Sequence, residues 1–171
     1  MKFLITGGAG FLGSHICEKY VNESEENKVI CLDNFSNSNL FNIRALLGKK
    51  NFKMVKGDIR NKDILDKLMP GVDFVFHLAA QIHVDKSIIE PVETYETNVL
   101  GTLNVLEAAR THDAKRIIIA STSEVYGPAK YAPMDENHPL ESPHLYGASK
   151  IAADRMALAY NHTYNLGIDI V

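Results

Sequence analysis

The sequence predicts an α/β protein with a doubly wound parallel sheet, the Rossmann fold, and helices on both faces. Short apolar segments alternate with longer segments of helical periodicity, the pattern of consecutive β-α-β units. A glycine-rich segment, Gly7 to Gly13, follows the first apolar segment. A later segment, Ile117 to Ile119, is unbroken and apolar, as in strands buried on both faces of a parallel sheet. Ligands of such sheets bind at the carboxyl ends of the strands, where we expect the site.

The composition is ordinary for one globular domain. The 171 residues are 46% hydrophobic and carry a net charge of −3, so no global field favours nucleic acid. No segment is long enough to span a membrane. Cys17 and Cys31 lie in different predicted elements, which is typical of reduced thiols in a cytoplasmic protein. The seven histidines are scattered, so no metal site is predicted.

The first β-α unit carries a dinucleotide fingerprint. A strand from Lys2 to Thr6 precedes the glycines, and a helix from about Gly10 to Val21 follows them. The early glycines let the backbone approach a pyrophosphate, which binds the free N–H groups at the start of the helix. The residues of this segment expected at the cofactor are Gly7, Gly10, Phe11, Leu12 and Gly13.

The second strand, Lys28 to Leu32, ends in Asp33. An acidic residue about 20 positions beyond the glycines binds the adenosine ribose hydroxyls, and it repels a 2′-phosphate. NAD is therefore favoured over NADP. A Ser/Asn-rich loop from Phe35 to Asn42 follows, and a short helix is allowed within Leu40 to Leu47.

The rest of the chain continues the alternation of strands and helices. The third strand ends next to Asp58, and Asn61 or Asp63 is positioned to cap the helix that follows. The remaining predicted elements are strand Phe52–Lys56, a helix through Met69, strand Val72–Leu78, a long amphipathic helix Pro91–His112, strand Lys115–Ala120, a helix from Tyr146, and strand Ile168–Val171.

Tyr146 and Lys150 lie four residues apart at the start of the last helix, so their side chains share one face. A free tyrosine has a pKa of about 10, and a neighbouring ammonium favours the phenolate. The pair can then act as a general base that takes a proton from an alcohol near neutral pH. Such pairs are common on solvated helix faces, so this reading depends on the other motifs at the same edge of the sheet.

These motifs, in this order, resemble the extended short-chain dehydrogenase/reductase family, in its NAD-dependent nucleotide-sugar epimerase/dehydratase branch. The resemblance covers essentially the whole chain. It rests on Thr6–Gly13, Asp33–Asn34, Gly57–Ile59, His77–Gln81, Asn98–Thr102, Ser121–Gly127 and Tyr146–Lys150.

The resemblance implies NAD as the cofactor. Asp58 and Ile59 would flank the adenine, whereas Lys150 would bind the nicotinamide ribose and depress the pKa of Tyr146. The other residues that it implies at the cofactor are Asn34, Leu78, Ala79, Ala80, Gln81, Asn98 and Tyr146.

It also implies a nucleotide-diphosphate sugar as substrate, oxidised at C4 to a 4-ketosugar while Thr122 binds the 4-hydroxyl. Epimerases then return the hydride to the other face, 4,6-dehydratases remove the C5 proton and expel the C6 hydroxyl, and decarboxylases lose the C6 carboxylate. Glu124 resembles the C5 base of the dehydratases, so we lean to 4,6-dehydratase-like chemistry. Ser123 stands where those enzymes often have an aspartate as the C6 acid. The candidate catalytic residues are Thr122, Ser123, Glu124, Tyr146 and Lys150.

Several alternatives stay open: a UDP-glucose 4-epimerase-like enzyme, a UDP-glucuronate decarboxylase, a reductase of small ketones, and a non-catalytic NAD-binding subunit. The decarboxylases usually carry arginines around the Tyr/Lys helix that this sequence lacks. A pure binding module would not need Thr122, Tyr146 and Lys150 together.

Members of the family usually continue past the sixth strand into a smaller substrate-binding domain. We therefore expect residues 1–171 to be the NAD-binding Rossmann domain, cut in or after that strand, with little turnover by itself. The helices Pro91–His112 and Tyr146–Tyr164 carry apolar residues beyond what one sheet face needs. We expect them to pair in a homodimer, as the resemblance implies.

Overall fold

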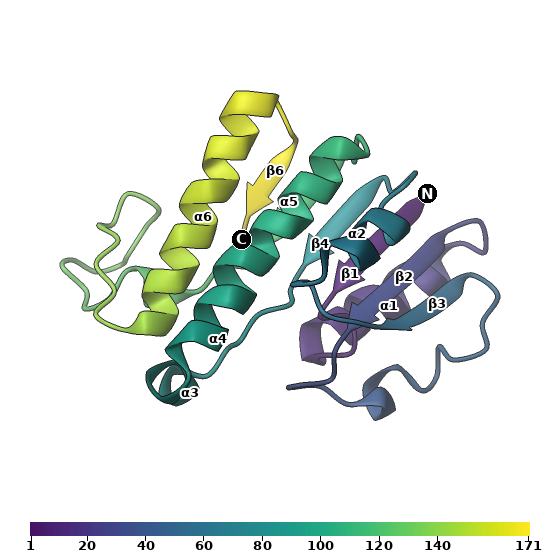
Figure 1. Cartoon of the computed structure of the whole chain (residues 1–171), viewed down its shortest axis with the longest axis horizontal. Coiled ribbons are helices and arrows are strands. Elements are labelled where there is room, and N and C mark those ends of the chain that lie inside the picture. The colour runs from purple at the N-terminus through teal and green to yellow at the C-terminus, as the bar shows by residue number, and fades with distance from the viewer.

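A computed structural model describes residues 1–171 and contains one six-stranded parallel sheet (Figure 1). Its strands are β1 (Lys2–Thr6), β2 (Lys28–Asp33), β3 (Phe52–Lys56), β4 (Phe74–His77), β5 (Arg116–Ile119) and β6 (Ile168–Ile170). Their order in the sheet is β3-β2-β1-β4-β5-β6. The order reverses between β1 and β4, which is where open sheets of this kind bind ligands. The predicted doubly wound Rossmann fold is confirmed.

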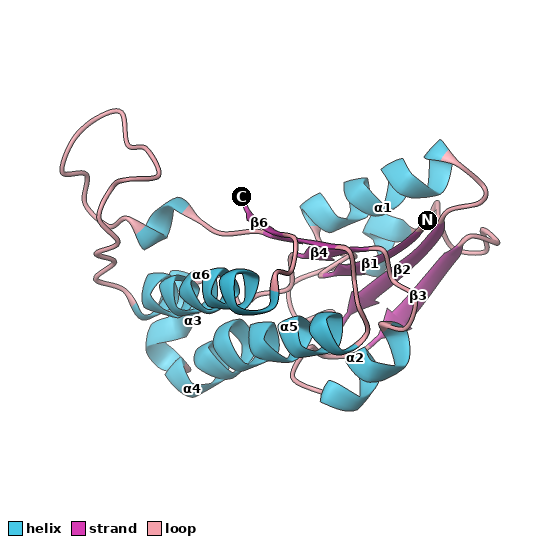
Figure 2. Cartoon of the chain, turned by 90° about the horizontal axis from the view of Figure 1, so that it is seen from above, coloured by secondary structure: helices cyan, strands magenta, loops and turns pink.

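Helices cover both faces of the sheet, unevenly. Figure 2 shows α1 on one side and α2, α4, α5 and α6 on the other. The helices are α1 (Phe11–Glu23), α2 (Lys62–Leu68), α3 (Val84–Ile89), α4 (Pro91–Tyr95), α5 (Gly101–Thr111) and α6 (Leu145–Tyr164), with 3₁₀ turns η1 (Leu40–Ile43) and η3 (Ser123–Val125) and a π-helical turn η2 (Glu96–Leu100). None of these helices has both the length and the apolar character to cross a membrane.

The core is divided by the sheet into two apolar clusters. Successive residues of β1 point to opposite faces, so Leu4 belongs to the cluster under α2, α5 and α6, whereas Phe3 and Ile5 belong to the cluster under α1. The first cluster has 17 buried residues and the second has 9. The second cluster is smaller because α1 is the single long helix that covers that face of the sheet.

The largest differences from the sequence prediction concern three segments. β4 is shorter than Val72–Leu78, because Val72 closes a turn by donating its N–H to the carbonyl of Met69 at 2.9 Å. The helix expected over Pro91–His112 is observed as α4, η2 and α5, and the π-helical turn widens it where the N–H of Gly101 donates to the carbonyl of Glu96. The six-residue α3 was not predicted.

Candidate cofactor and active site

The glycine segment turns sharply between β1 and α1. Gly7 has φ of 69°, and a Cβ on it would lie 2.8 Å from the nitrogen of Ala79. A Cβ on Gly13 would lie 2.3 Å from the carbonyl oxygen of Gly7. Neither position accepts a side chain unless the backbone moves. No side chain caps α1, and its first turn has no acidic residue. The free N–H groups at the start of α1 can therefore bind an anion.

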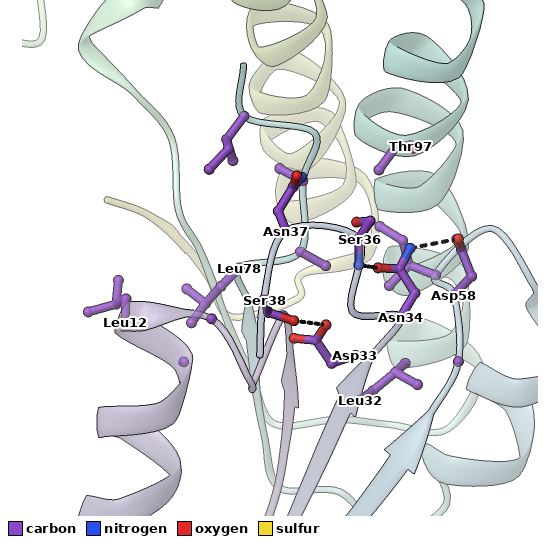
Figure 3. Close-up of a pocket in the computed structure, with 18 of the residues that line it drawn as sticks. Leu12, Leu32, Asp33, Asn34, Ser36, Asn37, Ser38, Asp58, Leu78 and Thr97 are labelled. Carbon is purple, nitrogen blue, oxygen red and sulfur yellow. Dashed lines mark hydrogen bonds between the residues drawn. The ribbon is translucent and has the colours of Figure 1, made fainter. Parts of the chain in front are cut away.

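A cavity of about 350 Å³ lies beside this turn, at the carboxyl ends of β1 to β4 (Figure 3). The predicted cofactor residues that line it are Gly7, Gly10, Phe11, Leu12, Gly13, Asp33, Asn34, Asp58, Ile59, Leu78, Ala79 and Ala80. The lining residues that the sequence analysis missed are Leu32, Ser36, Asn37, Ser38, Gly57, Ile82 and Thr97. The polar loop after β2 therefore contributes several residues to the cavity wall, in addition to Asp33 at the end of the strand.

Asp33 holds the glycine turn and the polar loop together. Its Oδ2 accepts the N–H of Ala9 at 2.9 Å, and its Oδ1 accepts the N–H of Phe35 at 2.8 Å. Oδ1 also accepts the hydroxyl of Ser38 at 2.7 Å, which Figure 3 shows. Two lone pairs per oxygen leave one acceptor position on Oδ2. The sequence predicted a carboxylate open to the ribose; in the structure Ser38 presents its hydroxyl beside that carboxylate.

Asp58 is fixed as a carboxylate at the far end of the cavity. Burial acts to raise its pKa, but hydrogen bonds from Arg60 and Asn34 outweigh burial and lower the pKa to about 2. The Asn34 amide donates at 3.0 Å and the Arg60 guanidinium at 2.7 Å, both to Oδ2 (Figure 3 shows the first). Because Asn34 also lines the cavity, this bond ties the ends of β2 and β3.

Gln81 and Asn98, both predicted at the cofactor, turn inward and do not line the cavity. Asn98 is 2% exposed, and its Oδ1 accepts the N–H of Gln81 at 2.8 Å. Its amide donates to the carbonyl of Gln81 and to the hydroxyl of Ser149, each at 3.0 Å. Asn98 therefore positions the loop after β4 against the helix that carries Tyr146 and Lys150.

A buried histidine, His77, links the same loop to β1. Its Nε2 lies 2.9 Å from the hydroxyl of Thr102, which itself donates to the carbonyl of Asn98 at 2.6 Å. Nε2 must therefore carry the proton, and Nδ1 accepts from the hydroxyl of Thr6 at 2.8 Å. Thr6 in turn accepts the N–H of Ala79 at 3.3 Å. These bonds form one directed chain beneath the cavity.

Helix α6 brings Tyr146 and Lys150 to the carboxyl end of β5. They are 8% and 5% exposed, and the Lys150 ammonium donates to the carbonyl of Ala120 at 2.7 Å. Burial raises the pKa of Tyr146, with the Thr122 hydroxyl acting in the opposite direction. The expected lowering of the Tyr146 pKa by Lys150 is not observed. Burial is the largest effect on this pKa, and the Lys150 ammonium donates to the carbonyl of Ala120.

The segment after β5 places two of the three remaining candidates near Tyr146. Thr122 accepts the N–H of Glu124 at 3.3 Å at the start of η3. Glu124 is half-buried, its carboxylate makes no hydrogen bond or ion pair, and its charge raises the pKa of Tyr146. Ser123 is exposed, and its hydroxyl makes no hydrogen bond to the other candidates. No group of three or more His, Cys, Asp or Glu side chains is arranged to hold a metal ion.

Residues 4–170 match the family model described as GDP-mannose 4,6 dehydratase. A dTDP-glucose 4,6-dehydratase of Streptomyces niveus is 37% identical over 176 residues, which cover 100% of this chain and 52% of the relative. A Methanocaldococcus jannaschii protein, whose assignment as a UDP-glucose 4-epimerase is provisional, is 42% identical over 95% of this chain and 52% of its own length. The chain thus spans about half the length of the curated relatives it matches.

Solved structures give the same grouping. A dTDP-glucose 4,6-dehydratase from Streptomyces venezuelae, with NAD bound, superposes with a TM-score of 0.91 at 37% identity, over 99% of this chain and 54% of that one. A UDP-N-acetylglucosamine 4-epimerase from Methanobrevibacter ruminantium gives 0.92 at 30% identity, over 99% and 53%. The chain therefore belongs to the NAD-dependent nucleotide-sugar epimerase/dehydratase family of extended short-chain dehydrogenases/reductases.

Proposed function

We propose that this chain is the NAD-binding Rossmann domain of an enzyme that oxidises a nucleotide-diphosphate sugar at C4. The observation that supports the proposal is that two features share one edge of the sheet. The glycine-turn cavity lies at the carboxyl ends of its strands, and the neighbouring strand end carries Tyr146, Lys150 and Thr122. The crowded positions at Gly7 and Gly13 and the uncapped start of α1 suit a pyrophosphate. When bound there, NAD would accept the hydride from sugar C4.

Residues of this chain would carry the proton. Thr122 would hold the sugar 4-hydroxyl, and Tyr146 would take its proton as general base. Lys150 has spare ammonium donors for the nicotinamide ribose, because only one contact, to Ala120, is used in the protein. Retention of all three groups favours an enzyme over a non-catalytic NAD-binding subunit.

We lean to 4,6-dehydratase-like chemistry because Glu124 is half-buried and unpaired beside Tyr146, as a base for the C5 proton would be. A 4-epimerase is the alternative, since Ser123 replaces the acid that the dehydratases often have. A decarboxylase is less favoured, although a UDP-glucuronic acid decarboxylase of Danio rerio is 35% identical over 93% of this chain. Incubating the full gene product with a panel of nucleotide sugars and identifying the products by NMR would decide between these branches.

NAD(H) should bind more tightly than NADP(H), because the Asp33 carboxylate repels a 2′-phosphate. Asp33→Ala should narrow this preference tenfold or more, since a hydrogen bond to a charged group contributes about 1.5–3 kcal/mol. Calorimetric titration of this chain with both cofactors measures the effect. Ser38→Ala is the matched control: it removes one contact of Asp33, keeps the charge, and should retain the preference. Equal or tighter NADP(H) binding by the unmodified chain would contradict the proposal.

We also propose a homodimer through the α4–η2–α5 path and α6, as the sequence predicted. Val92 and Leu100 are 69% and 47% exposed on this path, at a hollow that Val99 and Leu103 also line. Leu100→Glu should convert a dimeric full gene product into monomers, because it buries a charge in an apolar contact. Leu47→Glu, at a 44% exposed leucine elsewhere, should leave the mass unchanged. Sedimentation equilibrium measures both, and a monomeric unmodified protein would refute the dimer.

A further inference from the structure

A buried carboxylate lies behind the proposed catalytic pair and has no part in the reaction described above. Asp154 is on α6, one turn after Lys150, and is 7% exposed. Its Oδ2 accepts the hydroxyl of Ser121 at 2.5 Å, at the end of β5. Its Oδ1 is buried and accepts no hydrogen bond from the protein. A buried acceptor left in this way is unfavourable unless a nearby positive charge compensates it.

Lys150 is the buried cation on the same helix face. Residues four apart on a helix have Cβ atoms about 5–6 Å apart, and Lys150 is 5% exposed. Its ammonium has three donors, of which Ala120 takes one. Lys150 makes no ion pair within 4.0 Å, so Asp154 acts on it through space rather than by direct contact.

The other ionisable groups around this pair do not replace Asp154. His77 on β4 is buried and receives only repulsion from Lys150, and Glu124 on η3 acts on Tyr146. Burial raises the pKa of Asp154, and the Ser121 hydroxyl and the charges of Lys150 and Arg155 act in the opposite direction. Burial lowers the pKa of Lys150, and the charge of Asp154 is the effect that raises it.

We propose that Asp154 is a positioning residue that keeps Lys150 protonated in the active site. The oxidised nicotinamide ring is positively charged, and like charges nearby favour loss of a proton from a buried ammonium. Under the proposed function, a neutral Lys150 could not supply the positive charge that favours a phenolate at Tyr146. The consequence for catalysis rests on the proposed function. The coupling between Asp154 and Lys150 does not, because both residues lie on α6 of this chain.

The test is an NMR titration of the Lys150 ammonium, followed through its ¹³Cε and ¹⁵Nζ signals in this chain without cofactor. Asp154→Asn keeps the size of the side chain and an acceptor for Ser121 but removes the charge. It should lower the pKa of Lys150 by about one unit or more. Asp169→Asn removes a carboxylate from an exposed ion pair with Arg116, and should leave Lys150 unchanged. An unchanged Lys150 pKa in Asp154→Asn overturns the proposal.

If Asp154→Asn does not fold, the reciprocal variant gives the answer. Lys150→Met should raise the pKa of Asp154, read from its carboxyl carbon, and an unchanged value overturns the proposal. In the full gene product, Asp154→Asn should move the high-pH limb of kcat to lower pH. Failure of the unmodified chain to bind NAD would refute the proposed function and leave the titration result standing.

Discussion

Replacing Tyr146 with phenylalanine should slow C4 oxidation by about 10²–10⁴, which is the usual contribution of a general base. The variant keeps the ring, so the packing of a side chain that is 8% exposed should survive. NAD affinity should stay nearly unchanged, because Tyr146 does not line the cofactor cavity. Single-turnover formation of NADH in the full gene product measures the rate, and calorimetry measures the affinity.

Tyr164→Phe is the matched control. Tyr164 ends the same helix, is 48% exposed and packs against Tyr160, far along α6 from the proposed chemistry. It should turn over as the unmodified enzyme does. A Tyr146→Phe variant that oxidises C4 at the normal rate would show that another group takes the proton.

Glu124→Gln should separate the branches of the family. If Glu124 is the C5 base, the variant still reduces NAD⁺ with sugar but stalls at the 4-ketosugar, and product formation falls by about 10²–10⁴. Exchange of the C5 proton with deuterium from solvent, followed by NMR, should also disappear. Glutamine keeps the size of the side chain, so the loss would report the carboxylate itself.

The 4-epimerase alternative makes the opposite prediction. Glu124→Gln then keeps most of its turnover, and the C5 proton does not exchange with solvent in either the unmodified enzyme or the variant. Glu136→Gln, at an exposed acid of the loop before α6, serves as the control and should behave as the unmodified enzyme. A Glu124→Gln variant with normal dehydration would exclude Glu124 as the base.

The sequence predicted the edge of the sheet where the site lies, because parallel β-α-β units bring the carboxyl ends of all the strands to one edge. Gly7 follows β1, Asp33 ends β2 and Ala79 comes just after β4, and all three line one cavity. Ser38 was missed because its hydroxyl reaches Asp33 through the shape of a loop, which periodicity does not describe. The short α3 was missed for a similar reason: six residues are too few to show a helical pattern.

Residues whose side chains turn inward were harder to predict. The resemblance implied Asn98 at the cofactor, but only the structure shows that its side chain binds Gln81 and Ser149. The spacing of Tyr146 and Lys150 predicted that they share one face of a helix, and the structure adds that the Lys150 ammonium reaches the carbonyl of Ala120 after β5. The spacing did not give the direction of the Tyr146 pKa, because it does not reveal how deeply the phenol is buried, and burial raises that pKa.

The directed chain through His77 makes the stability of the fold sensitive to acid. Burial, and repulsion by Lys150, lower the pKa of His77 to about 3, whereas an unfolded histidine titrates near 6.5. Between these values the unfolded chain takes up a proton that the native chain cannot. The free energy of unfolding should therefore be greatest above pH 6.5 and decline toward pH 3, by at most about 1.4 kcal/mol per pH unit from this one group. A proton on Nδ1 would also face the Thr6 hydroxyl as a second donor, so acid should loosen β1 from β4 directly beneath the cofactor cavity.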